Sequence, residues 1–280
     1  MENIKIYWPV AKGVFNDVGE KNLTLTAAGV AFFAMFSLFP SLAALIALWG
    51  IALDPTAVER QIRPLETLLP QDVFDIIYNQ VFNLAQTENE YLSLAGLLGL
   101  MLALWSARAG VSAMMRAMNI VHKTPNRSFF RHYFKALFLT FLMVAFTAVG
   151  FMMTVGIPIL TSFIEFGSFE SYILMGVRWT AGTLVLFTAI SVLQRYGANR
   201  ENYKSAWVMP GAIFSTLLAI LASTALSTYI SHFDSYNKAY GSLGAVAALL
   251  MWLYIIALFV LIGAALNARL DMNRPRKAIV

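Results

Sequence analysis

The sequence has 280 residues, of which 59% are hydrophobic and only 12% are charged. The charged share is about half of what soluble domains carry, and an aromatic share of 14% excludes a disordered chain. Because the chain has no cysteine, disulfides, zinc–thiolate sites, iron–sulfur clusters and thiol nucleophiles are excluded. The composition predicts a chain whose main solvent is lipid.

The first part of the chain, residues 5–19, is expected to form a short interfacial helix. Val10, Val14 and Val18 recur at helical spacing, and Trp8 suits the headgroup level of a membrane. Two interpretations stay open for this helix. It could lie in the membrane interface, or it could be an ordinary leader that docks under a bundle of helices.

Uncharged runs that reach or approach the length needed to cross the hydrocarbon core recur along the chain. Backbone polar groups in lipid must be bonded within their own segment, and no run alternates as barrel strands do, so the runs predict helices. We expect one all-α transmembrane domain over residues 1–280. Its six spans are predicted at about 24–53, 92–116, 136–161, 172–194, 207–230 and 242–268, with a small helical outer segment at 54–90.

Lys and Arg are divided unequally between the two sides of the predicted spans. One side, which includes both termini, carries 16 of them, and the opposite side carries 4. The positive-inside rule then places both termini in the cytoplasm. The expected location is the bacterial inner (plasma) membrane, crossed several times.

The sequence offers little from which an active site could be built. Its histidines are His122, His132 and His232, and no zinc, nucleotide or nucleophile-elbow motif occurs. The uncharged runs contain no paired carboxylates for proton or metal chemistry. We therefore expect no enzyme, no catalytic residue, no metal and no cofactor. Nucleic acid is not an expected partner, because the basic loops lack aromatic stacking platforms.

Arginines near the two ends of the membrane are the candidate substrate- or lipid-facing residues. Arg178 is needed to complete the fourth span, and an intramembrane charge is a functional hypothesis by default. The alternative for Arg178 is that it snorkels outward and pairs with a nearby acid. Arg108 and Arg116 lie about 80° apart around the second span, and with Asn119 they could line an inner vestibule that attracts anions. The alternative is that they set topology at lipid phosphates.

Two features concern the movement and packing of the helices. Pro40 falls in the middle of the first span, where it is expected to kink or break the helix. A small residue recurs at every fourth position of the fifth span, in Gly211, Ser215, Ala219, Ser223 and Ser227. This pattern favours close packing of another helix backbone, and a moving interface would use the same surface.

The segment between the fifth and sixth spans, Asp234–Gly244, is predicted to be a turn. Gly241 and Gly244 are expected to open the next helix. Tyrosines at headgroup level are usually belt residues, whereas backbone N–H groups at a helix start can bind anions. The candidate lipid-facing side chains of this turn are Tyr236, Asn237 and Tyr240.

Four segments carry a recognisable pattern in one order. They are AAGVAFFAMFSLFPSL at Ala27–Leu42, LWSARAGVSAMMRAMNIV at Leu104–Val121, RYGANR…WVMPGA from Arg195 to Ala212, and YNKAYGSLG at Tyr236–Gly244. Together they resemble the YihY/BrkB family of bacterial inner-membrane proteins, and the resemblance covers nearly the whole chain. It implies six spans. The family usually reads G-A-E-L-N near the end of the last span, whereas this chain has Ala265 in place of the glutamate.

The resemblance implies less about activity. The family has carried a ribonuclease BN label, but this chain lacks the His/Asp clusters that a metal-dependent nuclease needs. The leading hypothesis is a transporter or flippase-like handler of an envelope lipid or amphiphile, with membrane lipids as partners. One alternative is a cation-coupled exporter of a small solute. Another is a non-transporting scaffold for envelope integrity that forms homo-oligomers through small-residue helix faces.

Overall fold

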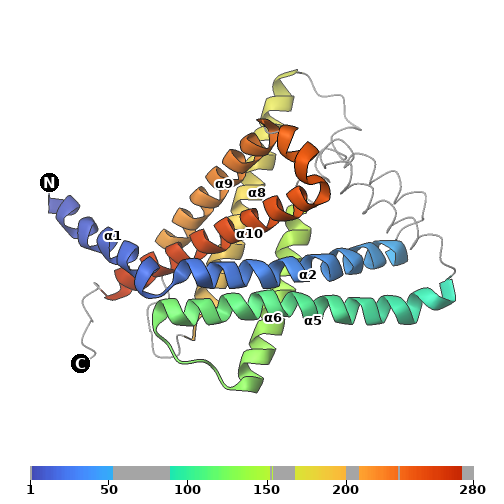
Figure 1. Ribbon diagram of the computed structural model, residues 1–280, viewed down its shortest axis with the longest axis horizontal. Coiled ribbons are helices and arrows are strands. Elements are labelled where there is room, and N and C mark those ends of the chain that lie inside the picture. Colours follow the sequence, from blue (N-terminus) through green and yellow to red (C-terminus); the bar gives the residue numbers. More distant parts are fainter. Residues whose placement is uncertain are drawn as a thin grey trace.

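The computed structural model describes residues 2–52, 89–151, 153, 168–199, 208–232 and 234–272. Within these residues, every extended regular element is a helix, in agreement with the predicted all-α class (Figure 1). The helices are α1 (Glu2–Glu20), α2 (Leu23–Ala52), α5 (Asn89–His122), α6 (Phe129–Phe151), α8 (Ser168–Tyr196), α9 (Met209–His232) and α10 (Asp234–Met272). Most of the predicted outer segment, 54–90, lies outside the described residues.

Three of the described helical segments are long and apolar enough to cross a membrane. They are Phe129–Gly150, Met209–Tyr229 and Val246–Met272, and a shorter apolar stretch covers Leu23–Ser37. The other predicted spans coincide with α2, α5 and α8, which contain side chains outside the described set. The count of six spans therefore stays a prediction.

The loop between α5 and α6 is shorter than the predicted spans imply, because α5 continues to His122 and α6 begins at Phe129. Lys123, the residue after α5, has a positive φ of 54°. Asn22, between α1 and α2, has a similar φ of 48°. The N–H of Lys123 bonds the carbonyl of Ile120, and the N–H of Thr124 bonds that of Asn119. This left-handed residue closes the last turn of the helix.

The predicted turn at Asp234–Gly244 is wrong, because these residues form the first turns of α10. Asp234 and Ser235 are residues that favour a helix start. Gly244 is buried, so packing holds this part of the helix despite the low helix propensity of glycine. The first span is also continuous: α2 runs through position 40 without a break, although the side chain of Pro40 lies outside the description.

The helices pack as neighbouring pairs. In Figure 1, α2 lies beside α5 and α9 lies beside α10, while α6 and α8 run at a steep angle to the first pair. Gly110 of α5 allows the close approach of α2, since a Cβ there would lie 3.3 Å from the Cα of Ala34. The hydroxyl of Ser106 also donates to the carbonyl of Phe36 across this contact, at 3.2 Å.

The described core lies where α2, α5 and α10 meet near the end of α1. It is rich in alanine and methionine, and small residues of this kind let membrane helices approach closely. Ala265, which stands where the family usually has glutamate, is fully buried in this core. The valines of α1 contribute too: Val10 is buried, and Val14 and Val18 pack against the core. The first helix therefore docks on the bundle through the valine face.

Candidate functional site at the basic end of the helices

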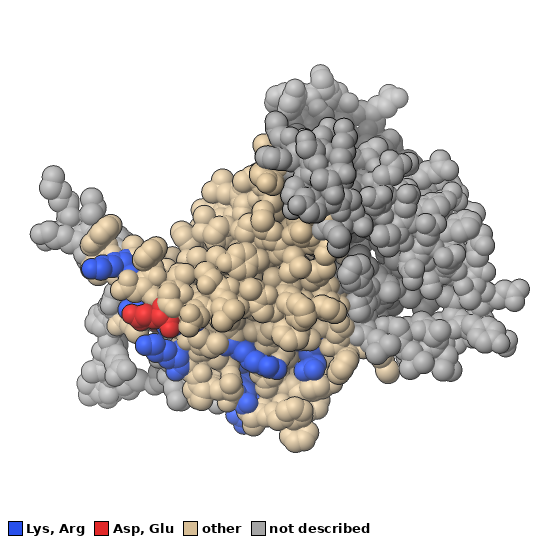
Figure 2. Space-filling model, viewed as in Figure 1, with Lys and Arg blue, Asp and Glu red and all other residues tan. Residues whose placement is uncertain are grey.

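The charged side chains of the described residues gather at one end of the helices. Figure 2 shows Lys and Arg along the lower and left margin of the described surface, with a small patch of Asp and Glu among them at the left, and the described surface away from these margins is uncharged in this view. Contacts join the helix ends there. Lys21, after α1, donates to the carbonyl of Val121 in α5 at 2.8 Å, and Arg269 of α10 reaches Asp17 of α1. Basic residues from several predicted inner segments thus share one end, which we call the basic end.

At the basic end, α5 and α6 bring together a group of residues that we call the α5–α6 cluster: Arg108, Ser112, Arg116, His132 and Tyr133. The first three recur at every fourth position, so they lie along one side of α5. The guanidinium of Arg108 lies over the ring of Tyr133, with its Cζ 4.4 Å from the ring centroid. Arg116 donates to the hydroxyl of Ser112 at 3.3 Å, and Ser112 Oγ lies 2.7 Å from His132 Nε2.

The positive charge of this cluster has no carboxylate beside it. The sequence contains no Asp or Glu between Glu90 and Glu165, and within the described residues neither Arg108 nor Arg116 forms an ion pair. The Nε atom of Arg108 is buried and has no hydrogen-bond partner there. A buried donor without a partner costs about 1–3 kcal/mol. Within the described residues, the charge of the two arginines is therefore not balanced by a carboxylate.

Large apolar side chains surround the cluster on the outer surface of the two helices. Trp105 of α5 is 61% exposed, one turn before Arg108, and Phe134 of α6 is 65% exposed, next to Tyr133. The exposed aromatic stripe of α6 recurs at helical spacing in Phe130, Phe134, Phe138 and Phe141. The charged cluster and an exposed aromatic surface therefore lie on the same two helices.

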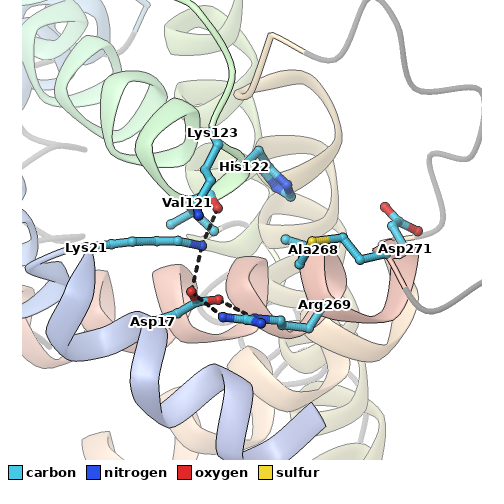
Figure 3. Close-up of a pocket in the computed structure, with 9 residues that line it drawn as sticks. Asp17, Lys21, Val121, His122, Lys123, Ala268, Arg269 and Asp271 are labelled. Atoms are coloured by element: carbon cyan, nitrogen blue, oxygen red, sulfur yellow. Dashed lines mark hydrogen bonds and ion pairs between the residues drawn. The ribbon is translucent and has the colours of Figure 1, made fainter. Parts of the chain in front are cut away.

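A second polar group at the basic end is built around Asp17, whose side chain is fully buried (Figure 3). Arg269 donates to both carboxylate oxygens at 2.7 Å, and the amine of Lys21 lies 3.0 Å from one of them. Burial alone would raise the pKa of Asp17. The hydrogen bonds and charges of Arg269 and Lys21 outweigh it, and the pKa lies below its ordinary value of 3.8. The carboxylate is therefore ionised at neutral pH.

A cavity of about 160 Å³ adjoins this ion group. Besides the ion group, its lining includes His122 and Lys123 at the end of α5 and Asp271 of α10. Figure 3 shows Lys21 between the carbonyl of Val121 and the carboxylate of Asp17. The cavity mixes acidic and basic side chains that already contact one another, which distinguishes it from the acid-free α5–α6 cluster.

Asn119, expected to line an inner vestibule with the arginines, instead holds the α5–α6 loop. It is only 2% exposed. Its amide donates to Asn126 at 3.0 Å, and its carbonyl accepts from the hydroxyl of Thr124 at 3.2 Å and from the backbone of Asn199 at 2.8 Å. Both ends of the amide are therefore used within the chain. The structure places Arg108 against Tyr133 and links Arg116 through Ser112 to His132, whereas Asn119 belongs to the loop scaffold.

The first part of the small-residue stripe of α9 packs against α10 through a buried polar group, whereas Ser227 at the end of the stripe is exposed. Gly211, Ser215 and Ala219 are buried, and Ser223 accepts a hydrogen bond from Trp252 at 3.0 Å. Asn267 accepts from the backbone of Gly211 at 2.8 Å and donates to Gln194 at 2.9 Å. Further bonds complete the group, namely Gln194 to Ser215 and to the Val260 carbonyl, Asn267 to the Val208 carbonyl and Ser215 to the Phe259 carbonyl.

Several predicted site residues lie in described helices but their side chains do not belong to the described set. Arg178 lies within α8, and Tyr236, Asn237, Tyr240 and Gly241 lie within the first turns of α10. Their predicted roles toward lipid therefore stay predictions. No group of three His, Asp or Glu side chains suited to a metal occurs in the part of the chain that the structure describes.

Sequence reasoning missed Asp17, Arg269, Ser112 and His132. The helical spacing of Arg108 and Arg116 includes Ser112, so that residue could have been found. His132 lies near the start of α6, and no spacing in the sequence pairs it with Ser112 of α5. No sequence signal pairs Asp17 with Arg269, because they come from opposite ends of the chain.

Comparison with known proteins identifies the family of the chain. The family model described as virulence factor BrkB matches residues 14–278. The chain is 30% identical over 255 residues to the ribonuclease-like protein YfkH of Bacillus subtilis (strain 168), covering 89% of this chain and 90% of that one. It is 26% identical over 257 residues to a UPF0761 membrane protein of Pseudoalteromonas translucida (strain TAC 125), covering 89% and 81%. No solved structure matches. The chain is therefore a membrane protein and belongs to the BrkB virulence factor family.

Proposed function

We propose that this protein handles an envelope lipid or another amphiphile in the bacterial inner membrane, as a transporter or flippase-like protein. The observation that carries the proposal is the α5–α6 cluster. Arg108 contacts Tyr133 of α6 and Arg116 is linked through Ser112 to His132 of α6, neither arginine has a carboxylate beside it within the described residues, and exposed aromatic side chains lie on the same two helices. A charged headgroup and an apolar tail need these two surfaces next to each other. A soluble ion would need only the first.

The proposal includes the orientation and the number of spans. Lys and Arg are enriched on the cytoplasmic side of membrane proteins, so we assign the basic end to the cytoplasm. The clustering of basic residues from α5, α6 and α10 at one end supports this assignment. With six spans, both termini lie in the cytoplasm, and the α5–α6 cluster lies at the level of the inner leaflet headgroups.

The alternatives receive less support from the described residues. In the scaffold hypothesis, the small-residue face of α9 forms contacts between copies, but Gly211, Ser215 and Ala219 are buried in the chain's own packing. In the cation-coupled exporter, a carboxylate would carry the coupling ion. Asp17 is the fully buried carboxylate among the described residues, and it is ion-paired in α1 at the basic end.

Lipid translocation by the purified, full-length protein in liposomes tests the proposal. A fluorescent phosphatidylglycerol analogue in the inner leaflet is followed by quenching from outside as it reaches the outer leaflet. We expect translocation that depends on the protein and is reduced in Arg108→Ala and Arg178→Ala. The exposed Arg195 provides a control at the basic end, and Arg195→Ala should retain activity.

Failure to move any lipid from a native membrane extract would contradict the proposal. A nuclease assay on the same preparation addresses the name of the Bacillus subtilis relative. We expect no protein-dependent cleavage of transfer RNA, with or without added divalent metal.

A further inference from the structure

We propose that the α5–α6 cluster binds the phosphate group of an anionic phospholipid headgroup. This proposal rests on the proposed function and names the chemistry of its ligand. Arg108 and Arg116 would contact the phosphate oxygens, and the exposed aromatic stripe of α6 would contact the acyl chains. The argument depends on three properties of the cluster: unbalanced charge, unused donors and an adjacent apolar surface.

The charge of the cluster is unbalanced over a long stretch of chain. No acid occurs in the sequence between Glu90 and Glu165, and within the described residues neither Arg108 nor Arg116 forms an ion pair. Near the low-dielectric membrane interior, cations without counterions are costly, and their attraction for an anion is stronger than in water. An anionic ligand would supply the missing counter-charge.

Unused donors make the ligand a hydrogen-bond acceptor. The Nε of Arg108 is buried without a partner, and within the described residues the contact of this guanidinium is the face of Tyr133. Stacking on an aromatic ring leaves the edge of a guanidinium available for in-plane hydrogen bonds. Phosphate presents oxygens at the spacing that this planar fork matches. The geometry therefore favours phosphate over a halide ion.

Ser112 and His132 act as positioning residues. Ser112 Oγ accepts a hydrogen bond from Arg116 at 3.3 Å and lies 2.7 Å from His132 Nε2. This chain of contacts fixes Arg116 of α5 relative to α6. The side chain of Arg116 is exposed, so its remaining donors are accessible from outside the helix pair.

The apolar surface distinguishes a lipid from free phosphate. Phe134, Phe138 and Phe141 continue along the exposed side of α6 away from the cluster, and from residue 133 to 141 a helix rises about 12 Å. A contiguous row of exposed apolar side chains is typical of a surface that contacts lipid or another apolar surface. An acyl chain on this stripe would place its headgroup at the cluster.

Binding measurements on the full-length protein in an uncharged detergent test the assignment. Native mass spectrometry would count bound phosphatidylglycerol, with phosphatidylcholine and inorganic phosphate as separate arms. We expect phosphatidylglycerol to bind in preference to phosphatidylcholine, and about tenfold more weakly to the Arg108→Gln/Arg116→Gln variant. Arg108→Lys should bind with intermediate affinity, because lysine keeps the charge but lacks the planar fork.

The control is Arg195→Gln, which removes an exposed arginine from the same end and should bind phosphatidylglycerol as the unmodified protein does. Equal weakening in this control would show a general charge effect and would overturn the site. Binding of inorganic phosphate with no preference among lipids would overturn the lipid assignment. The unfolding temperature of each variant shows whether it is folded. If the Arg108→Gln/Arg116→Gln variant is unfolded, the phosphatidylglycerol affinity of Arg108→Lys tests the site instead.

The two proposals fail in different ways. Loss of the phosphatidylglycerol preference together with intact translocation in liposomes would contradict this inference and leave the proposed function standing. Specific binding that depends on Arg108 and Arg116, without translocation of any lipid, would contradict the proposed function and leave the binding site standing.

Discussion

Arg269 donates hydrogen bonds of 2.7 Å to both carboxylate oxygens of Asp17, and this contact joins the last described helix to the first. Gly13 makes the contact geometrically possible, because Arg269 crosses α1 at this position. A Cβ on Gly13 would lie 3.1 Å from Arg269 Nε. The ion group thus fixes α1 against α10 at the basic end, beside the ends of α5 and α10 that line the adjoining cavity.

Replacing Arg269 with alanine should detach α1 more than a surface substitution would. Asp17, which is fully buried in the unmodified protein, would keep Lys21 as its ion-pair partner among the described residues. Loss of one partner of a buried ion pair costs several kcal/mol, and because Arg269 is partly exposed we expect about 1–3 kcal/mol. Denaturant unfolding in detergent micelles would measure it. Asp17→Asn combined with Arg269→Ala should cost less than the sum of the single changes, and additive costs would contradict the pairing.

The attachment of α1 should depend on pH only in strong acid. The pKa of Asp17 lies below 3.8, so its stabilising contribution is present above that value and is lost as pH falls through the lowered pKa. Hydrogen exchange of α1, corrected for intrinsic rates, should therefore be constant from about pH 8 to pH 5 and rise below about pH 4. In Asp17→Asn the step should be absent. Release of α1 between about pH 5 and pH 7 would assign the step to another group.

The sequence predicts the helical class well because backbone polar groups in lipid must be paired within the protein, which leaves few possible structures. Uncharged runs identify the positions of α2, α9 and the main part of α10, since a helix satisfies its own backbone groups. Helix ends are harder to predict. Gly241 and Gly244 suggest a turn by local propensity, but the chain is already helical from Asp234. Tertiary packing overrides propensity at such positions.

The candidate site could be predicted only in part, for a related reason. Arg108 and Arg116 are found from sequence because charge is rare in this chain and therefore conspicuous. His132 and Tyr133 join them only when α6 is folded against α5, which no period in the sequence encodes. Asn119 looked equally polar, but its buried amide is used by the loop. Distinguishing a scaffold amide from a ligand-facing one needs the three-dimensional contacts.

Gly211→Ala should destabilise the packing of α9 against α10. A Cβ at Gly211 would overlap the carbonyl oxygen of Gly263 and the side chain of Asn267, so the helices would have to separate. Overpacking of this kind costs about 1–3 kcal/mol. The control is Gly29→Ala, where a Cβ would meet nothing within 4 Å. That change should stabilise α2 by about 0.5–1 kcal/mol, because alanine favours a helix. Thermal unfolding of both variants in the same detergent compares them, and equal effects would contradict the close contact.

Asn119→Ala should loosen the α5–α6 loop and expose it to protease. The substitution removes the hydrogen bonds of the buried Asn119 amide to Asn126, Thr124 and Asn199, all of which are partly buried contacts. We expect a loss of about 1–3 kcal/mol and faster trypsin cleavage after Lys123 or Arg127. Asn126→Ala is the matched control. Of the three hydrogen bonds, it removes the 3.0 Å bond between the Asn119 amide and the Asn126 side chain. Its cleavage rate should lie between those of Asn119→Ala and the unmodified protein. Equal rates for all three would mean that the Asn119 amide does not hold the loop in place.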